Sequence, residues 1–105
     1  MRVLLTNHDL ATRGGTQVYV RDLATELLRR GHTPIVYSLT HGDVARELRS
    51  RTVPVVSDLD EVPPPDLIHG QEHLGTMTAL LRYPRAPAIF FCHSFFGWGS
   101  APPRF

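Results

Sequence analysis

The sequence predicts an α/β fold, a Rossmann-like open parallel sheet of about five strands in the order 3-2-1-4-5 with helices on both faces. Two observations support this fold class. Short apolar runs without polar alternation recur along the 105 residues, as is typical of strands buried on both faces of a parallel sheet. The segments between these runs carry apolar residues at helical spacing and are joined by short links, which indicates right-handed βαβ crossovers.

The first strand is expected at Arg2–Thr6, which is apolar and β-branched. A helix is expected over residues 16–30, because its apolar residues repeat on one face while charged residues occupy the other. Thr16 is the expected N-cap of this helix, and Gly31 is expected at its C′ position. The apolar face consists of Val20, Leu23, Ala24, Leu27 and Leu28.

The middle of the chain continues the alternation of strands and helices. A second strand is expected at residues 33–39, a short helix at Asp43–Ser50 and a brief strand at residues 52–56. Residues 57–65 are expected to form an extended linker, because consecutive prolines cannot join a strand ladder. The inward face of the short helix is expected to consist of Val44, Ala45 and Leu48.

The last third predicts a strand, a helix and another strand. The fourth strand is expected at residues 66–69, and the following helix ends at Tyr83, before a proline. Residues 88–92 are expected to form a fifth, buried strand, and residues 93–105 have no period but carry several aromatic side chains. The inward face of the last helix is expected to consist of Leu74, Met77, Thr78 and Leu81.

Bulk composition excludes several classes of function. A formal charge of +1 at pH 7, from 11 basic and 10 acidic residues, does not indicate a nucleic-acid-binding stripe or a membrane anchor. The first apolar run is too short for a signal peptide or a transmembrane segment, and the single cysteine, Cys92, cannot form an intramolecular disulfide. A cytoplasmic location is therefore expected.

A loop with two adjacent glycines, Gly14 and Gly15, lies between the first strand and the first helix. Glycine permits a sharp turn and the close approach of a ligand, and the free N–H groups of a helix's first turn favour negative charge. The loop therefore predicts a site for a phosphate or a carboxylate at Gly14, Gly15 and Thr16. A plain turn is the alternative interpretation of the glycine pair.

Polar residues follow several of the expected strands, at the edge where ligands bind in open α/β sheets. Imidazole titrates near neutral pH and can act as a base, an acid or a donor to a sugar hydroxyl. Each histidine could also be a strand-end residue that bonds a loop carbonyl. The residues expected at this rim are His8, Asp9, His69, Gln71, His73, His93 and Ser94.

No metal and no cofactor are expected. His69 and His73 could chelate a metal only on a helix, whereas His69 is expected in a strand. The sequence also lacks the Gly-x-Gly-x-x-Gly of dinucleotide-binding folds, a Gly-Lys-Ser/Thr phosphate loop and a Gly-x-Ser-x-Gly nucleophile elbow.

Five stretches of the sequence, taken in order, form a recognisable motif pattern. They are Arg2-Val3-Leu4-Leu5, Gly14-Gly15-Thr16-Gln17-Val18-Tyr19-Val20, Leu23-Ala24-x-x-Leu27-x-x-x-Gly31-His32-x-Pro34-x-Val36, Asp66-Leu67-Ile68-His69-Gly70-Gln71 and Phe91-Cys92-His93-Ser94. In this order they resemble the N-terminal part of the family-4 retaining glycosyltransferases of GT-B fold. The resemblance covers residues 1–94.

The resemblance implies that residues 1–105 are the acceptor-side, N-terminal domain of a two-domain glycosyltransferase. Gly14 and Gly15 would approach the diphosphate of a nucleotide-sugar, and His93 would lie near the transferring sugar and the acceptor. His69, Gln71 and His73 would line the acceptor side. The nucleotide-sugar and the acceptor are substrates, so the resemblance implies no cofactor.

The donor-binding domain of such enzymes has no counterpart in these 105 residues, and the domain is expected to be incomplete and inactive alone. The strand at residues 88–92 would then be an open apolar edge, so a homodimer is expected through this edge or through residues 93–105. The alternative is a stand-alone flavodoxin-like binding module with a small-anion site and an aromatic surface for self-association.

Overall fold

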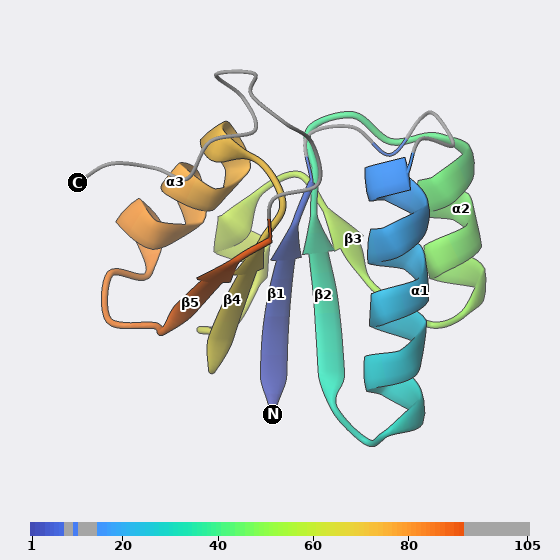
Figure 1. Cartoon of the computed structure of the whole chain (residues 1–105), viewed down its shortest axis with the longest axis horizontal. Coiled ribbons are helices and arrows are strands. Elements are labelled where there is room, and N and C mark those ends of the chain that lie inside the picture. Colours follow the sequence, from blue (N-terminus) through green and yellow to red (C-terminus); the bar gives the residue numbers. More distant parts are fainter. Residues whose placement is uncertain (8–9, 11–14, 92–105) are drawn as a thin grey trace.

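Five parallel strands form one sheet in the order β3-β2-β1-β4-β5 (Figure 1), which confirms the predicted fold class. The structure is a computed structural model that describes residues 1–7, 10 and 15–91. All five strands point the same way, so their carboxyl ends meet at one edge of the sheet. The strands are β1 (Arg2–Thr6), β2 (Thr33–Tyr37), β3 (Val55–Val56), β4 (Leu67–Gly70) and β5 (Ala88–Phe90).

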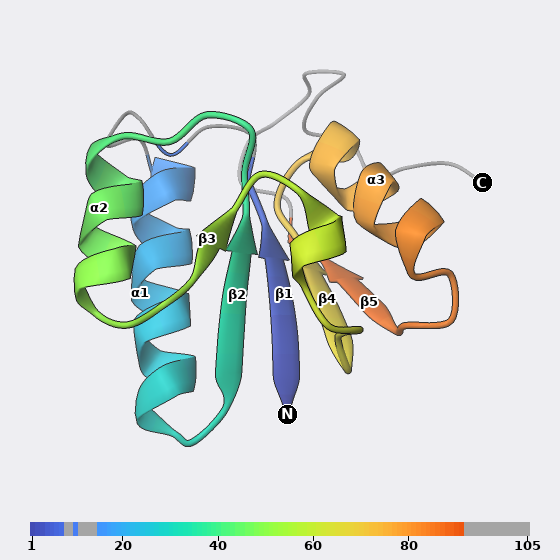
Figure 2. The same ribbon diagram turned by 180° about the vertical axis from the view of Figure 1, so that it is seen from behind.

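Helices cover both faces of the sheet, because successive residues of β1 point to opposite sides (Figures 1 and 2). Val3 and Leu5 enter one core with α1 (Gly15–Arg29) and α2 (Asp43–Ser50). Leu4 enters the other core with α3 (His73–Arg82) and a 3-10 turn at Leu59–Glu61. Within the described ranges, no helix has the length and apolarity needed to cross a bilayer.

The predicted apolar face of α1 is confirmed, and the helix ends in a Schellman motif at the predicted glycine. Gly31 has φ 87°, and its N–H donates to the Leu28 carbonyl at 3.1 Å. The N–H of His32 donates to the Leu27 carbonyl at 3.0 Å, which completes the motif. The expected N-cap is wrong: α1 begins at Gly15, so Thr16 already belongs to its first turn.

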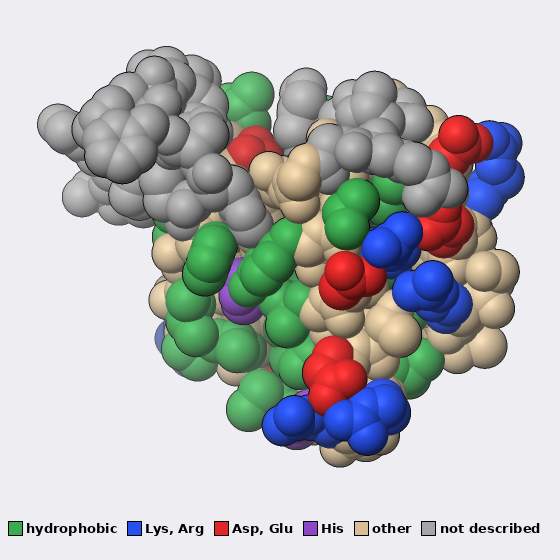
Figure 3. Space-filling view, turned by 45° about the vertical axis from the view of Figure 1, so that its right-hand side comes forward, with side chains coloured by type: hydrophobic (Ala, Val, Ile, Leu, Met, Phe, Trp, Pro, Cys, Tyr) green, Lys and Arg blue, Asp and Glu red, His purple; other side chains and the backbone are tan. Residues whose placement is uncertain are grey.

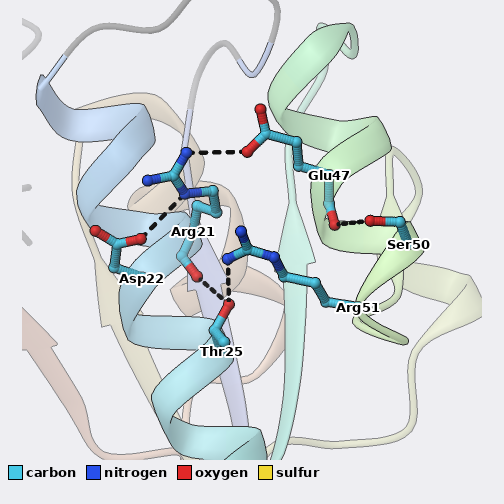
Figure 4. A network of polar contacts seen from close by, with 6 residues as sticks. All are labelled: Arg21, Asp22, Thr25, Glu47, Ser50 and Arg51. Atoms are coloured by element: carbon cyan, nitrogen blue, oxygen red, sulfur yellow. Dashed lines mark hydrogen bonds and ion pairs between the residues drawn. The ribbon is translucent and has the colours of Figure 1, made fainter.

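Polar contacts hold α1 against α2 (Figure 4). Arg21 Nη1 donates to Glu47 Oε2 at 2.9 Å, and Arg21 Nε donates to Asp22 Oδ1 at 3.0 Å. These carboxylates raise the pKa of Arg21, Asp22 more than Glu47. Lower down, Arg51 Nη1 lies 3.1 Å from Thr25 Oγ1. The contacts hold the second and third turns of α1, a helix that begins at the carboxyl edge of the sheet.

The middle of the chain follows the prediction for α2 but not for its neighbours. The bounds of α2 and its buried residues Val44, Ala45 and Leu48 are as expected. The following strand is shorter than predicted, because residues 51–52 form a turn in which Thr52 has φ 64°.

The expected extended linker contains a turn that contributes to the core. Leu59 and Val62 are buried under α3, and the Tyr83 hydroxyl lies 3.0 and 3.1 Å from their carbonyl oxygens. Consecutive prolines do keep residues 63–65 out of the sheet, but the residues before them form a 3-10 turn.

The predicted inward face of α3 is wrong. Its buried residues are Thr76 and Ala79, whereas Leu74 is 46% exposed and Leu81 66% exposed. Small side chains let α3 lie close to β4, and the Thr76 hydroxyl meets Thr6 at the end of β1. Apolar spacing alone therefore gave the wrong rotation of this helix.

The expectation of a buried fifth strand is wrong, whereas the expectation of an open apolar edge agrees with the structure. The strand lies at the edge of the sheet, with Ile89 51% exposed and Phe91, just after it, 44% exposed. A continuous apolar run is the same for a central strand and for an edge strand, but the predicted order 3-2-1-4-5 already places the fifth strand at the edge. Cys92 lies outside the described residues.

Candidate functional site

Buried polar side chains gather at the carboxyl edge of the sheet. The order of the strands reverses between β1 and β4, and ligands bind at this switch point in open α/β sheets. Among the described residues, each buried polar side chain ends a strand, comes directly after one, or belongs to the first turn of α3 at this edge. They are Thr6, Asn7, Ser38, Gln71 and Thr76.

A chain of hydroxyl groups joins the ends of β1 and β4 to α3. The N–H of Gln71 donates to Thr6 Oγ1 at 3.4 Å, and Thr6 Oγ1 lies 3.2 Å from Thr76 Oγ1. Thr76 Oγ1 in turn donates to the Glu72 carbonyl at 2.5 Å. The single hydroxyl hydrogen of Thr76 is donated to the Glu72 carbonyl, so in the contact between the two hydroxyl groups Thr6 is the donor and Thr76 the acceptor. This chain fixes α3 relative to the sheet.

Gly70 is required by a close approach at the same place. A Cβ at this position would collide with the Thr76 side chain. The absence of a side chain at Gly70 therefore allows the first turn of α3 to come close to the end of β4.

Two of the predicted rim residues, His69 and Gln71, are in contact. Gln71 Nε2 faces His69 Nδ1 and lies 3.3 Å from the carbonyl oxygen of His69. The His69 ring lies near two aromatic rings: Tyr19 of α1 has its centroid 6.3 Å away, and Phe91 has its centroid 6.4 Å away.

The third described rim residue, His73, is the first residue of α3, directly after the N-cap Glu72. Glu72 Oε1 accepts a hydrogen bond from the N–H of Gly75 at 2.7 Å. The carboxylate therefore occupies the place that an external anion would take at this helix end. Glu72 and His73 bring polar groups to the rim but do not form an anion site.

Gly15 of the predicted anion loop is exposed at the start of α1. Among the described residues, nothing lies within 4 Å of the position that a Cβ would take there. Its backbone is not in the left-handed region, so neither crowding nor conformation requires glycine at this position. The first turn of α1 contains no acidic residue, so its N–H groups keep their positive character.

Five predicted site residues lie outside the described part of the chain: His8, Asp9, Gly14, His93 and Ser94. Their roles stay predictions. The described residues contain no group of three or more His, Cys, Asp or Glu side chains that could hold a metal ion.

The sequence reasoning missed several residues of the carboxyl edge. Asn7 is 3% exposed, and its Nδ2 has no hydrogen-bond partner among the described residues. A buried donor without a partner costs about 1–3 kcal/mol, so it needs an explanation. Its one sequence signal is a polar residue directly after a buried strand. Thr6 and Thr76 gave no signal, since they meet across 70 residues.

The family of the chain follows from comparison with known proteins. The model for Glycosyltransferase Family 4 matches residues 13–105, most of the chain. The chain belongs to Glycosyltransferase Family 4. The predicted resemblance to the family-4 glycosyltransferases is thereby confirmed, and the sheet edge described above is that of a glycosyltransferase family-4 domain.

The fold of this family-4 chain is similar to that of a solved structure, the crystal structure of Anabaena HepE in complex with UDP and glucose. The TM-score is 0.61 at 19% sequence identity, a level of identity that shows the fold alone. The match covers 90% of this chain and 30% of the HepE chain, so this chain spans less than a third of that protein's length. A search of curated proteins gives no match.

Proposed function

We propose that the chain is the acceptor-side part of a glycosyltransferase that moves a sugar from a nucleotide-diphosphate-sugar to an acceptor. The observation that carries this proposal is the match of the family model to residues 13–105. The structure supports it, because buried polar groups and the open start of α1 share the carboxyl edge of the sheet. The HepE structure, which has a similar fold, holds UDP and glucose.

The proposal gives the predicted residues separate roles. Gly14, Gly15 and Thr16 present backbone N–H groups to the donor diphosphate. His93 acts next to the transferring sugar, and the remaining residues face the acceptor. These acceptor-side residues are His8, Asp9, His69, Gln71, His73 and Ser94.

Transfer requires a donor and an acceptor held together, with the leaving diphosphate stabilised from both sides. We therefore propose that residues 1–105 act with a donor-binding domain and are inactive by themselves. The match to only 30% of the HepE chain is consistent with this division. No metal and no cofactor enter the proposed reaction, and a cytoplasmic location is part of the proposal.

The donor loop can be tested by titrating the isotope-labelled chain with UDP-glucose and following backbone amides by NMR. The amides of Gly15 and Thr16 are expected to shift most. Gly15→Asp places a negative charge in open space and is expected to weaken binding about tenfold or more, because it repels the diphosphate. Gly15→Ala is the uncharged control and should bind like the natural chain. Shifts confined to other parts of the sheet would contradict the assignment.

We also propose that the chain forms a homodimer through the β5 edge. Hydrophobic side chains gather around a histidine on the face shown in Figure 3. Ile89 and Phe91 are exposed at this edge, and the Phe91 ring stacks on Tyr19 with centroids 5.0 Å apart. An exposed apolar edge strand favours pairing with a second copy.

Sedimentation velocity tests the dimer. The natural chain is expected to sediment as a dimer at tens of micromolar, and Ile89→Lys is expected to sediment as a monomer, because it places a charge at the edge. Leu81→Lys is the matched control, since Leu81 is exposed on α3 and should leave the dimer intact. A natural chain that is monomeric at these concentrations refutes the proposal.

A further inference from the structure

A small cavity lies between the ends of β1 and β2 and the first turns of α3. Its volume is about 30 Å³, enough for a single oxygen-sized group. Its polar lining residues are Asn7, Tyr37, Glu72 and Thr78, whose hydroxyl donates to the Leu74 carbonyl at 2.8 Å, and the exposed side chains of Leu39 and Leu74 border it. The cavity lies beside the β1–β4 switch point, at the same edge as the proposed acceptor residues.

Asn7 gives this cavity an unused donor. The residue is held in place by the sheet, because its backbone N–H donates to the Tyr37 carbonyl at 3.0 Å. Its side chain is almost completely buried, and Nδ2 has no partner among the described residues. A buried N–H of this kind is expected to have a partner in the functional state.

The charges around the cavity select the kind of ligand. Glu72 carries a carboxylate whose Oε1 is bonded to the N–H of Gly75, and this charge repels an anion. The Tyr37 hydroxyl keeps its proton at neutral pH, because burial, and then the charges of Glu72 and Asp58, raise its pKa. A cation would be repelled by the partly positive N–H hydrogens of Asn7. A neutral hydroxyl fits both Asn7 and Glu72, because its oxygen accepts from the Asn7 amide while its hydrogen is donated to the Glu72 carboxylate.

We propose that this cavity binds one uncharged hydroxyl group of the sugar acceptor, whose oxygen accepts from Asn7 Nδ2 and whose hydrogen is donated to the Glu72 carboxylate. The carbon skeleton of the ligand contacts Leu39 and Leu74. The assignment to the acceptor rests on the proposed function, whereas the selection of a neutral hydroxyl rests on the cavity. The acceptor group at this place is therefore a polyol or a sugar and not a phosphate or an amine.

NMR on the full chain tests the ligand class directly, because Asn7 is the only asparagine in the sequence and its side-chain amide signals are unique. D-Glucose is the neutral polyol probe, with inorganic phosphate and methylammonium as charged probes of similar or smaller size. Glucose is expected to shift the Asn7 side-chain signals and the amide of Gly75. An unchanged Asn7 signal at saturating glucose, or a larger response to either charged probe, overturns the proposal.

Two variants separate binding from structure. Asn7→Leu removes the unpartnered donor at similar volume, so the variant is expected to unfold at the same or a higher temperature while the glucose response falls about tenfold or more. Glu72→Gln keeps an oxygen for the Gly75 N–H and is expected to weaken glucose about threefold to tenfold. Leu81→Ala is the control and should leave glucose binding unchanged. Undiminished binding by Asn7→Leu refutes the proposal, and if this variant does not fold, Asn7→Ala is judged by the same criterion.

A transfer assay with a donor-binding domain present distinguishes this inference from the proposed function. If sugar is transferred and Asn7→Leu raises the acceptor KM without changing the donor KM, both hold. If transfer occurs and the acceptor KM is unchanged, only the hydroxyl site fails. If glucose binds at Asn7 but no nucleotide-sugar is consumed, the proposed function fails and the hydroxyl site stands.

Discussion

The contact between Gly70 and Thr76 shows how single residues set the shape of the candidate site. Gly70 ends β4, and the Thr76 side chain occupies the space where a Cβ would be. The same threonine links β1 to the first turn of α3 through its hydroxyl. A change at either position therefore moves α3 away from the edge that carries Asn7 and His69.

Gly70→Ala is expected to destabilise the fold by about 1–3 kcal/mol, because the added methyl group must displace Thr76 from a buried contact. Urea unfolding followed by circular dichroism measures the change. Gly15→Ala is the matched control: it lies in open space on a helix and should leave stability unchanged or raise it by up to about 1 kcal/mol. Equal changes in the free energy of unfolding for the two substitutions would show that Thr76 does not crowd Gly70.

At this scale the sequence was a partial guide to the site. His69 and Gln71 were expected at the rim, and the structure brings them into contact. Thr6 and Thr76 could not be found, because a hydroxyl pair between distant residues leaves no local pattern. Asn7 was visible as a polar residue after a strand, but its buried and unpartnered amide becomes evident only from the packing around it.

At the scale of an element, α1 is stabilised at its C-terminal end by charge as well as by Gly31. Arg29 Nη2 and Arg30 Nε lie 2.6 and 2.8 Å from Glu26 Oε1. Arg29 first, and then Arg30, lower the pKa of Glu26 from 4.5 to about 2. The two arginines also suit the negative end of the helix dipole.

The lowered pKa of Glu26 predicts a pH dependence. Because the folded pKa lies below the unfolded value, the stabilisation is fully present above about pH 4.5 and is lost as the pH falls toward 2. Glu26→Gln is therefore expected to unfold at lower urea than the natural chain near pH 7, and the difference should shrink steadily between about pH 5 and pH 3. Glu61→Gln, at an exposed carboxylate without an ion pair among the described residues, is the control. A difference that stays constant across this range would contradict the ion-pair explanation.

Elements differ in how well their sequence predicts them. The bounds of α2 and the buried face of α1 follow from helical spacing, because both helices cover the interior of the sheet. The rotation of α3 does not follow from spacing, because small residues and a threonine pair decide which side lies against β4. The exposure of β5 depends on its place at the edge, which its own residues do not encode.

At the scale of the whole molecule, β1 joins two cores that lie on opposite faces of the sheet. Leu5 belongs to the core under α1 and α2, and Leu4 belongs to the core under α3. The strand order was predictable because short links and right-handed crossovers leave few arrangements for alternating strands and helices. The same rules predicted that the candidate site lies at the carboxyl edge of the sheet.

Leu4→Ala and Leu5→Ala are each expected to destabilise the chain by about 2–5 kcal/mol, because both side chains are fully buried. Both layers are expected to loosen together in each variant, because neighbouring residues of β1 serve both cores. Hydrogen exchange of the α1 and α3 amides checks this. Faster exchange only in the layer next to the substituted side chain would show that the two cores unfold separately.

The common direction of the five strands has a consequence for how such a protein can change. At the rim where the strands finish, the exposed parts of the loops can be lengthened or exchanged, whereas Leu10 in the loop after β1 is fully buried in the core and has to be kept. The opposite rim, with the proline-rich entry to β4 and the bond between the Arg2 N–H and Asp66, works as a fixed base. New recognition properties are therefore most readily engineered by remodelling one rim while leaving the other untouched.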